Sequence, residues 1–385
     1  MRRGKKGYPT PRRTMRNENF LRFVKKTTRV IVSCLFIFSL FLSAYADKKQ
    51  CEWDNIKKIV AVGDLHGDYD NCVKILKTAG LVDDTLKWIG GDTHLVQTGD
   101  IMDRGDYAKE ILDLIMKLEV EAEEAGGKVH MLIGNHEELN ITGMALGTPG
   151  YVSKIQFLAF LPESLREKME KEFKKLVEKS LKEGNNSSAA ITDIEEWWSD
   201  QITRDRRAQY EYTVNFNDDY GKWIIEQNAV IRINDVIFVH GGISERFSTW
   251  PLEKINDTFR EELNIYRLAY KRGRLPMGYK PEIVYAPDAP HWFRDFVLKD
   301  EKYFTAEANK ILKNLGVSHM VIAHTPAGSG GGSPIVGTEG IHIIHKFKER
   351  VWIIDTGISD YYGGILSYLT IENGKFSTKE WRDEE

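Results

Sequence analysis

The sequence of 385 residues predicts an α/β fold, and two observations carry that prediction. Short apolar runs, typical of buried strands, recur along the chain, and most of them run directly into a cluster of polar residues. Amphipathic stretches with the period of an α-helix lie between the early runs. Strand, loop and helix in this alternation are the pattern of an α/β protein.

Six apolar runs are the predicted strands. In chain order they are 58–62, 94–98, 129–133, 236–239, 320–323 and 351–354. A helix is predicted over 107–125, where Ile111, Ile115, Leu118 and Ala122 recur at spacings of three and four.

A second amphipathic helix is predicted over 163–183, followed by a break at Gly184. We interpret about 150–228 as an inserted helical subdomain or lid, because this segment carries no motif of its own. The stretch 342–381 alternates in the manner of antiparallel strands, which would cover a face or an edge of a sheet.

The N-terminal segment has the organisation of a secretory signal peptide. Residues 2–29 are rich in Arg and Lys, 30–43 form an unbroken apolar run, and Ala44-Tyr45-Ala46 matches the small-x-small cleavage pattern. The apolar run is shorter than the ~20 residues that cross a bilayer. We therefore predict a signal peptide over 1–46 with cleavage near Ala46.

Cleavage there would leave a mature domain of residues 47–385 in an exported compartment, either the periplasm or the secretory pathway and extracellular space. An uncleaved leader would instead anchor the chain to the membrane, and Met15 is an alternative start to Met1. Three cysteines are too few for a disulfide framework. Cys51 and Cys72 either pair or remain free thiols, and the sequence leaves both alternatives open.

Residues 1–46 and the rest of the chain carry opposite net charge. Residues 1–46 hold 11 of the 54 basic residues and one acid, which leaves 43 basic and 56 acidic residues, a net charge of −13, for the remainder. That balance disfavours non-specific nucleic-acid binding, which depends on basic groups. A phosphate site in this chain needs local positive charge or metal.

Polar side chains follow five of the predicted strands at the point where each strand ends. They are Asp64 and His66, then Asp100, Asp103 and Arg104, then Asn135 and His136, and finally His240 and His324. Ligands of open α/β sheets bind beyond the carboxyl ends of the strands, so these loops can converge.

Carboxylate, amide and imidazole groups of this kind suit Mn, Fe or Zn rather than a soft metal that needs thiolates. Two metals about 3.5–4 Å apart can clamp a phosphate and activate a water, provided that one carboxylate bridges them. Asp100 is the expected bridge because it lies in the middle loop.

The ordered motifs GDLHGD, GDIMDRG, GNHE, HGG and a single late histidine resemble the phosphoprotein phosphatase family of calcineurin-like metallophosphoesterases. The details GGDTHLVQTGD, GNHEELN, HGGIS and DTGIS…YGG are most similar to its Shewanella-like protein phosphatases. The resemblance covers about 56–371. It implies a calcineurin-like metallophosphoesterase sandwich of two mixed β-sheets flanked by helices, with 150–228 as the helical insertion.

The resemblance also implies roles for individual residues. It places Asp64, His66 and Asp100 on a first divalent metal ion, and Asp100, Asn135, His240 and His324 on a second. It makes His136 the general acid, oriented by Asp103, and it assigns phosphate binding to Arg104, Asn135 and Arg294. Manganese is the expected metal, with iron or zinc as alternatives.

The resulting expectation is an exported phosphatase that hydrolyses phosphomonoesters by attack of a metal-bridging hydroxide. Its substrate would be a protein phosphorylated on tyrosine, serine or threonine, or a small phosphoester. Hydrolysis of a nucleotide or dinucleoside polyphosphate on the same metal site is one alternative. A non-catalytic metal-binding module is another, but no ligand or acid is missing from the motifs. A zincin protease is excluded, because Asn140 replaces the second histidine of HExxH.

Overall fold

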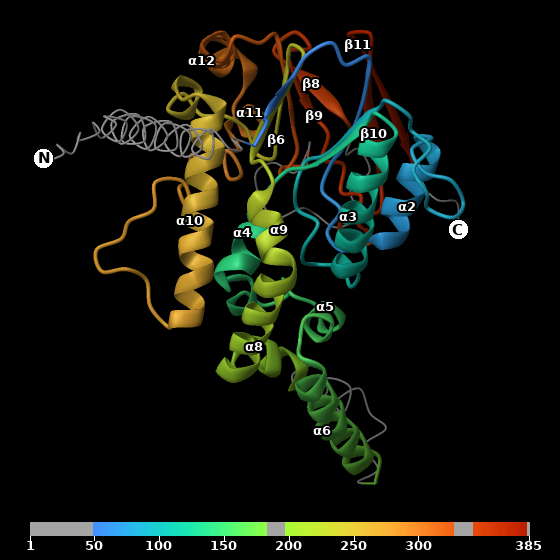
Figure 1. Cartoon of the computed structure of the whole chain (residues 1–385), viewed down its shortest axis with the longest axis vertical. Coiled ribbons are helices and arrows are strands. Elements are labelled where there is room, and N and C mark those ends of the chain that lie inside the picture. The colour runs from blue at the N-terminus through green and yellow to red at the C-terminus, as the bar shows by residue number, and fades with distance from the viewer. Residues whose placement is uncertain (1–48, 183–196, 327–341, 383–385) are drawn as a thin grey trace, which may run out of the picture. The chain divides into compact units, whose positions relative to one another are not determined.

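The strands form two mixed β-sheets, which helices flank (Figure 1). The structure is a computed structural model that describes residues 49–182, 197–326 and 342–382. The first sheet has the order β1-β5-β6-β7-β9-β8 and the second has the order β11-β10-β2-β3-β4. The two-sheet α/β architecture expected from the sequence is therefore confirmed.

In the six-stranded sheet, β6, β7 and β9 run parallel. Strand β5 pairs antiparallel with β6 and parallel with β1, and β8 pairs antiparallel with β9. Its strands are β1 (Glu52–Trp53), β5 (Val230–Ile233), β6 (Val236–Val239), β7 (His319–Ile322), β8 (Ile344–Lys346) and β9 (Val351–Ile353). The carboxyl ends of the three parallel strands consequently lie at one edge.

In the five-stranded sheet, β2, β3 and β4 run parallel and β10 pairs antiparallel with both β2 and β11. Its strands are β2 (Lys58–Val62), β3 (His94–Gln97), β4 (Lys128–Met131), β10 (Leu366–Glu372) and β11 (Lys375–Trp381). The hairpin of β10 and β11 occupies one edge, as the late alternating pattern predicted. Buried side chains of both sheets belong to one hydrophobic core.

Helices pack on both sheets and on one another. The longer ones are α2 (Tyr69–Thr78), α3 (Ala108–Glu124), α4 (Asn135–Thr142), α6 (Glu163–Lys182), α8 (Arg206–Phe216), α10 (Leu252–Arg272) and α12 (Glu301–Leu315). The shorter ones are α5 (Lys154–Ala159), α9 (Lys222–Glu226) and α11 (Asp295–Leu298), with single turns at η1 (Ala145–Gly147), η2 (Asn217–Gly221), η3 (Phe247–Thr249) and η4 (Asp360–Tyr362). Helix α3 packs against β4, and α10 packs against β5, α4 and α8.

Local sequence signals set where helices near the polar loops begin and end. Asp68 caps α2, because its carboxylate accepts a hydrogen bond from Asn71 N at 3.0 Å. Helix α4 starts directly after Gly134 and ends at Thr142, and the next residue, Gly143, has the left-handed φ of 77° that favours glycine. Both helices therefore start within a motif loop.

Each of the six apolar runs forms a strand, and the two predicted helices appear as α3 and α6. Strand β5 and helices α10 and α12 are further elements that the sequence analysis did not anticipate. The described part of 150–228 is helical, and the predicted break at Gly184 lies outside the described residues. The same holds for the predicted signal peptide over 1–46.

Residues Cys51–Glu385 form one compact unit. Within its described part, Cys51 and Cys72 are buried and free, so the alternative of free thiols applies to this structure. The described residues contain no helix that is both long enough and apolar enough to cross a membrane.

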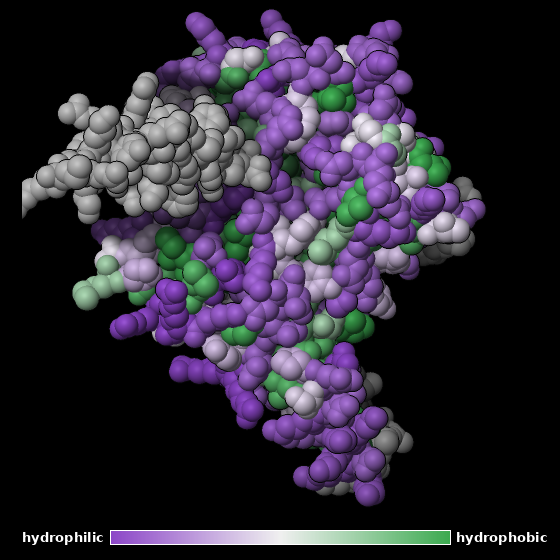
Figure 2. Space-filling view, in the orientation of Figure 1, coloured by the Kyte–Doolittle hydropathy of each residue, from purple (hydrophilic) through white to green (hydrophobic). Residues whose placement is uncertain are grey.

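The surface is mostly hydrophilic on the face drawn in Figure 2, with hydrophobic residues scattered over it. Single exposed apolar side chains are normal on a protein surface. The polar loops, rather than an apolar face, are therefore the candidate location of the functional site.

Candidate metal centre and active site

The polar loops that follow the parallel strands of both sheets meet at one place. Within the five-stranded sheet, Leu65 N and His66 N donate to Asp100 O at 3.0 and 2.9 Å. Across the two sheets, His240 Nδ1 donates to Thr98 O at 3.0 Å. The convergence expected from the strand ends is thus present.

Two glycines allow the first and second loops to touch backbone to backbone. A Cβ atom at Gly67 would lie 2.6 Å from the carbonyl carbon of Gly105, and one at Gly105 would clash with the carbonyl oxygen of His66. Gly67 also has a φ of 68°, which disfavours any side chain. These glycines bring the motif loops within reach of one another.

Several predicted site residues have a strained backbone conformation. Five of them adopt a left-handed φ although they are not glycine: His66 (43°), Asp100 (56°), Asp103 (70°), Arg104 (73°) and His324 (67°). Such conformations are costly and persist only where surrounding contacts enforce them, most often at functional sites.

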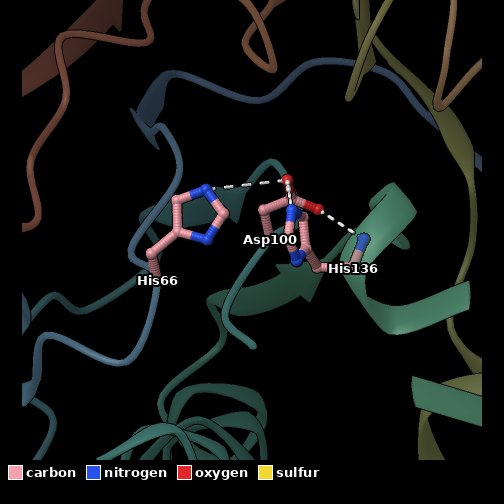
Figure 3. Close-up of side chains that lie close together, drawn as sticks. All are labelled: His66, Asp100 and His136. Carbon is pink, nitrogen blue, oxygen red and sulfur yellow. Dashed lines mark hydrogen bonds and ion pairs between the residues drawn. The ribbon is translucent and has the colours of Figure 1, made fainter. Parts of the chain in front are cut away.

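The predicted ligands of the first metal form one buried cluster. His66 Nε2 lies 3.9 Å from Asp64 Oδ2 and 3.8 Å from Asp100 Oδ2. Figure 3 shows the Asp100 carboxylate between the imidazoles of His66 and His136. The structure therefore brings Asp64, His66 and Asp100 together as the sequence predicted.

The predicted ligands of the second metal gather around His240 Nε2. This atom lies 3.0 Å from Asn135 Oδ1, 3.1 Å from His324 Nδ1 and 3.3 Å from Asp100 Oδ2. Ligand atoms about 2.1 Å from a common ion are about 3.0–3.4 Å apart, so these separations fit a metal-binding group. Asp100 belongs to both clusters, which is the placement required of a bridging carboxylate.

Two of the histidines have the hydrogen bonds of metal ligands. His66 Nδ1 donates to Met102 O at 3.0 Å and His240 Nδ1 donates to Thr98 O, so Nε2 of each ring is left to bind. Burial next to His136 lowers the pKa of His66 to about 4, which keeps Nε2 unprotonated. His324 Nε2 is buried and has no hydrogen-bond partner in the described structure.

The electrostatics of the cluster favour cation binding. Burial, with the nearby carboxylates of Asp355 and Asp100, raises the pKa of Asp64 well above its ordinary value. Burial acts on Asp100 in the same direction, but the imidazoles of His240 and His136 outweigh it and hold the pKa of Asp100 well below its ordinary value. Buried carboxylates that crowd one another in this way are best compensated by bound cations.

His136 is held at the edge of the first cluster. Its Nδ1 lies 2.6 Å from Asp103 Oδ2, and its Nε2 lies 4.0 Å from Asp100 Oδ2. Because a carboxylate can only accept, the hydrogen bond to Asp103 fixes the proton on Nδ1. Burial lowers the pKa of His136, but Asp100 and the hydrogen bond to Asp103 outweigh burial and raise it above the ordinary value.

Arg104 lies in an aromatic setting. Its guanidinium carbon is 4.1 Å from the ring centroid of Tyr151, 5.2 Å from that of Tyr361 and 5.9 Å from that of Tyr362. The ring of Tyr151 also lies 4.9 Å from that of His136. The Arg104 guanidinium therefore stacks on tyrosine rings, one of which also lies next to His136.

Arg294 lies next to His324, one of the predicted metal ligands. Its Nη1 donates to His324 O at 3.1 Å and to Thr325 Oγ1 at 2.8 Å. Arg294 also lines an open cavity of about 600 Å³, whose other lining residues are Tyr285, Pro287, Asp288, Trp292, Phe293 and Asp295. The structure thus places Arg294 beside the other predicted site residues.

Two buried acids inside the quoted motifs, Glu137 and Asp355, had no role predicted from the sequence. The Glu137 carboxylate accepts from Asp100 N (2.8 Å), Ile101 N (2.9 Å), Met102 N (3.3 Å) and Gly134 N (2.8 Å). It thereby fixes the backbone of the loop that carries Asp100.

Asp355 follows β9 and accepts from Gly357 N at 3.1 Å, and burial raises its pKa to about 6. Both acids lie in motifs that the sequence shows, but their hydrogen-bond partners could not be predicted from it.

A family model described as calcineurin-like phosphoesterase matches residues 57–328, which contain all the clustered ligands. The chain belongs to the calcineurin-like phosphoesterase family. As a calcineurin-like phosphoesterase it is a metal-dependent phosphoesterase, of a family whose site holds two divalent metal ions. The family resemblance seen in the motifs is confirmed.

This phosphoesterase is similar to two named phosphatases over most of their length. It is 30% identical over 279 residues to Shewanella-like protein phosphatase 2 of Arabidopsis thaliana. The matched region covers 72% of this chain and 68% of that protein. It is 26% identical over 353 residues to Shewanella-like protein phosphatase 1 of Plasmodium berghei, covering 87% of this chain and 80% of that protein.

Solved structures show the same phosphoesterase fold. A cold-active protein tyrosine phosphatase at 25% identity has a TM-score of 0.58 and covers 86% of this chain and 80% of its own. A mutant cold-active protein tyrosine phosphatase at 24% identity has a TM-score of 0.60, with coverage of 86% and 82%.

Proposed function

We propose that this phosphoesterase hydrolyses phosphomonoesters on proteins, with phosphotyrosine as its first substrate class and phosphoserine or phosphothreonine as the second. One observation carries the proposal: the Asp103–His136 pair, at 2.6 Å, lies beside Arg104 and the buried ligand clusters. A proton donor, a phosphate-binding cation and a metal centre are the groups that phosphomonoester hydrolysis needs.

The two ions would be held by the ligands predicted from the sequence. These are Asp64, His66 and Asp100 for one ion, and Asp100, Asn135, His240 and His324 for the other. When bound, the ions supply positive charge that activates a water and neutralises phosphoryl oxygens. The oxygen and imidazole donors suit manganese, with iron and zinc as the other candidates.

His136 is the proposed general acid. Asp103 accepts the hydrogen bond from Nδ1–H. Nε2 of the protonated ring therefore carries the proton that passes to the leaving-group oxygen as the phosphorus–oxygen bond breaks. Its raised pKa favours the protonated form that this step requires. Asp103 then stabilises the imidazole orientation throughout the transfer.

Arg104, Asn135 and Arg294 are the proposed phosphate-binding residues. A planar guanidinium can donate two parallel hydrogen bonds to phosphoryl oxygens, which suits Arg104 and Arg294. Arg104 lies near His136 and Arg294 donates to His324 O, so together they would hold the phosphoryl group near the ions.

The aromatic side chains favour an aryl phosphate. Tyr151 contacts both Arg104 and His136, so the ring of a phosphotyrosine next to these groups would pack against Tyr151. The similar proteins are named as protein phosphatases and as a protein tyrosine phosphatase, which supports the same substrate class.

The test compares initial rates of the metal-stripped chain reloaded with Mn²⁺ on a phosphotyrosine peptide, a phosphoserine peptide and a dinucleoside tetraphosphate. We expect the highest kcat/KM on the phosphotyrosine peptide. A higher value on the dinucleotide would overturn the protein substrate class and favour a polyphosphate hydrolase.

His136→Asn tests the proposed acid. We expect kcat on the preferred peptide to fall by ~10²–10⁴-fold while the metal content stays near two ions per chain. His345→Asn is the matched control, because His345 is about half exposed and lies outside the site. Unchanged turnover in the His136 variant would remove this residue from the mechanism.

We also propose that the protein is exported after cleavage near Ala46. The support is the order of basic, apolar and small residues in 1–46. Mass spectrometry of the protein from its native cells should find a mature N-terminus near Asp47. An intact N-terminus at Met1 or Met15 would overturn this proposal.

A further inference from the structure

A closed ring of buried polar side chains lies behind the Asp103–His136 pair. Its members are Asp103, Asn140, Gln156 and Tyr212, and each is completely buried. Asp103 follows β3 and Asn140 lies on α4, whereas Gln156 lies on α5 and Tyr212 on α8. Two of the four members therefore come from the helical segment 150–228, which carries none of the family motifs.

Gln156 holds both the side chain and the backbone of Asp103. Its Nε2 donates to Asp103 Oδ1 at 2.8 Å, and its Oε1 accepts from Asp103 N at 2.8 Å. Asn140 Nδ2 donates to the same Oδ1 at 2.9 Å and to His136 O at 2.9 Å. Asp103 Oδ2 is thereby left for His136 alone.

Tyr212 closes the ring. Its hydroxyl donates to Asn140 Oδ1 at 2.8 Å and accepts from Gln156 Nε2 at 3.0 Å. These bonds use both amide protons of Asn140, both of Gln156 and the hydroxyl proton of Tyr212. The ring therefore has one consistent arrangement of donors, which fixes both amide groups.

Aromatic packing holds the tyrosine in place. The ring of Tyr212 stacks on Phe157 with centroids 5.5 Å apart, and it meets the edge of Phe160 at 5.7 Å. Both phenylalanines are buried on the same segment as Gln156. Packing within this aromatic cluster therefore sets the orientation of the Tyr212 hydroxyl.

We propose that Gln156 and Tyr212 are positioning residues, through which the segment 150–228 holds Asp103 and His136 in the orientation for proton transfer. This inference rests on the proposed role of His136 as the general acid. A carboxylate that can rotate would present Oδ2 to His136 for only part of the time, and proton transfer is sensitive to such misplacement.

The expected signature is a dependence on the leaving group. Proton donation matters most when the leaving oxygen is strongly basic, as in a serine alkoxide, and least for a 4-nitrophenolate. Loss of the ring should therefore slow a phosphoserine peptide more than 4-nitrophenyl phosphate. A merely structural role would slow both substrates by the same factor.

The main variant is Tyr212→Phe, assayed in the full chain loaded with Mn²⁺. It keeps the aromatic packing but removes the hydroxyl that Asn140 and Gln156 share. We expect kcat for the phosphoserine peptide to fall about tenfold or more with KM nearly unchanged, and kcat for 4-nitrophenyl phosphate to fall by less than a third of that factor.

Tyr220→Phe is the matched control. The Tyr220 hydroxyl donates to Asp113 Oδ1 at 2.6 Å and its ring meets Phe160 at 5.3 Å, so this variant also loses a hydrogen-bonded hydroxyl from the same aromatic cluster. It lies outside the polar ring. Its ratio of the two kcat values should match that of the unmodified chain.

Gln156→Met is the second variant, and it replaces the amide by an apolar side chain of similar length. Thermal unfolding and metal analysis of both variants would check that they fold and bind metal. An equal effect on both substrates in the folded variants, or no effect, would overturn the positioning role.

His136→Asn in the same assay separates this inference from the proposed function. If His136→Asn is slow and Tyr212→Phe is normal, only the positioning role fails. If His136→Asn is fully active on the phosphoserine peptide, the proposed acid fails and the positioning role fails with it.

Discussion

Glu137→Gln is the substitution for which the structure gives the sharpest magnitude. One carboxylate oxygen accepts from Ile101 N and Met102 N, and the other accepts from Asp100 N and Gly134 N. Glutamine retains one acceptor oxygen and replaces the other by an amide that can only donate. Two buried N–H groups lose their acceptor, and each such loss costs about 1–3 kcal/mol.

The expected loss of unfolding free energy is therefore about 2–6 kcal/mol, a large part of the ~5–15 kcal/mol available to a folded protein. Denaturant unfolding of the metal-loaded chain measures it, and metal content should fall because Asp100 is no longer held. Glu124→Gln changes the same charge at an exposed position. A difference between the two variants below about 0.5 kcal/mol would refute the anchoring role of Glu137.

Four further outcomes follow from the same geometry. Gly105→Ala should lower stability and metal content together, because its Cβ clashes with the carbonyl oxygen of His66; calorimetry and metal analysis check this. Arg104→Lys should lower kcat/KM by about 10–100-fold through loss of the bidentate fork, as steady-state kinetics would show. Chelation should abolish activity and, at free metal about 100 times its Kd, remove about 2.7 kcal/mol of stability per ion, measured by unfolding with and without metal. Cys72, with a pKa raised to about 12 by burial, should resist alkylation at pH 8 until the chain unfolds, which mass spectrometry can follow.

The strands were predictable because each buried run is short, apolar and bounded by polar residues. Strand β5 was missed because Arg232, which pairs with Glu52 and Asp54, interrupts its apolar run. Helix α10 carried a readable signal, since Leu252, Ile255, Phe259 and Leu263 recur at helical spacing and are buried. Its many charged residues obscured that pattern in the sequence.

The proposed metal ligands were predictable because each of them directly follows a strand. Parallel strands bring such positions together within each sheet, and the packing of the two sheets then brings His240 and His324 to the ligands of the other sheet. The partners of Glu137 could not be predicted in this way, because they depend on which backbone N–H groups the folded loop leaves unpaired. The contacts of Gln156 and Tyr212 with Asp103 depend on tertiary packing alone.

The left-handed backbone at Asp103 and Arg104 connects residues that could be predicted from strand ends with contacts that depend on tertiary packing. Neither residue is glycine, so their φ values of 70° and 73° need external support. The segment 150–156 supplies it, because Gln156 Oε1 accepts from Asp103 N and Tyr151 O accepts from Arg104 N at 2.7 Å. The proposed metal ligands receive no such bonds from residues 150–156, all of which the structure describes. Disruption of this segment should therefore impair proton donation and phosphate binding before it impairs metal binding.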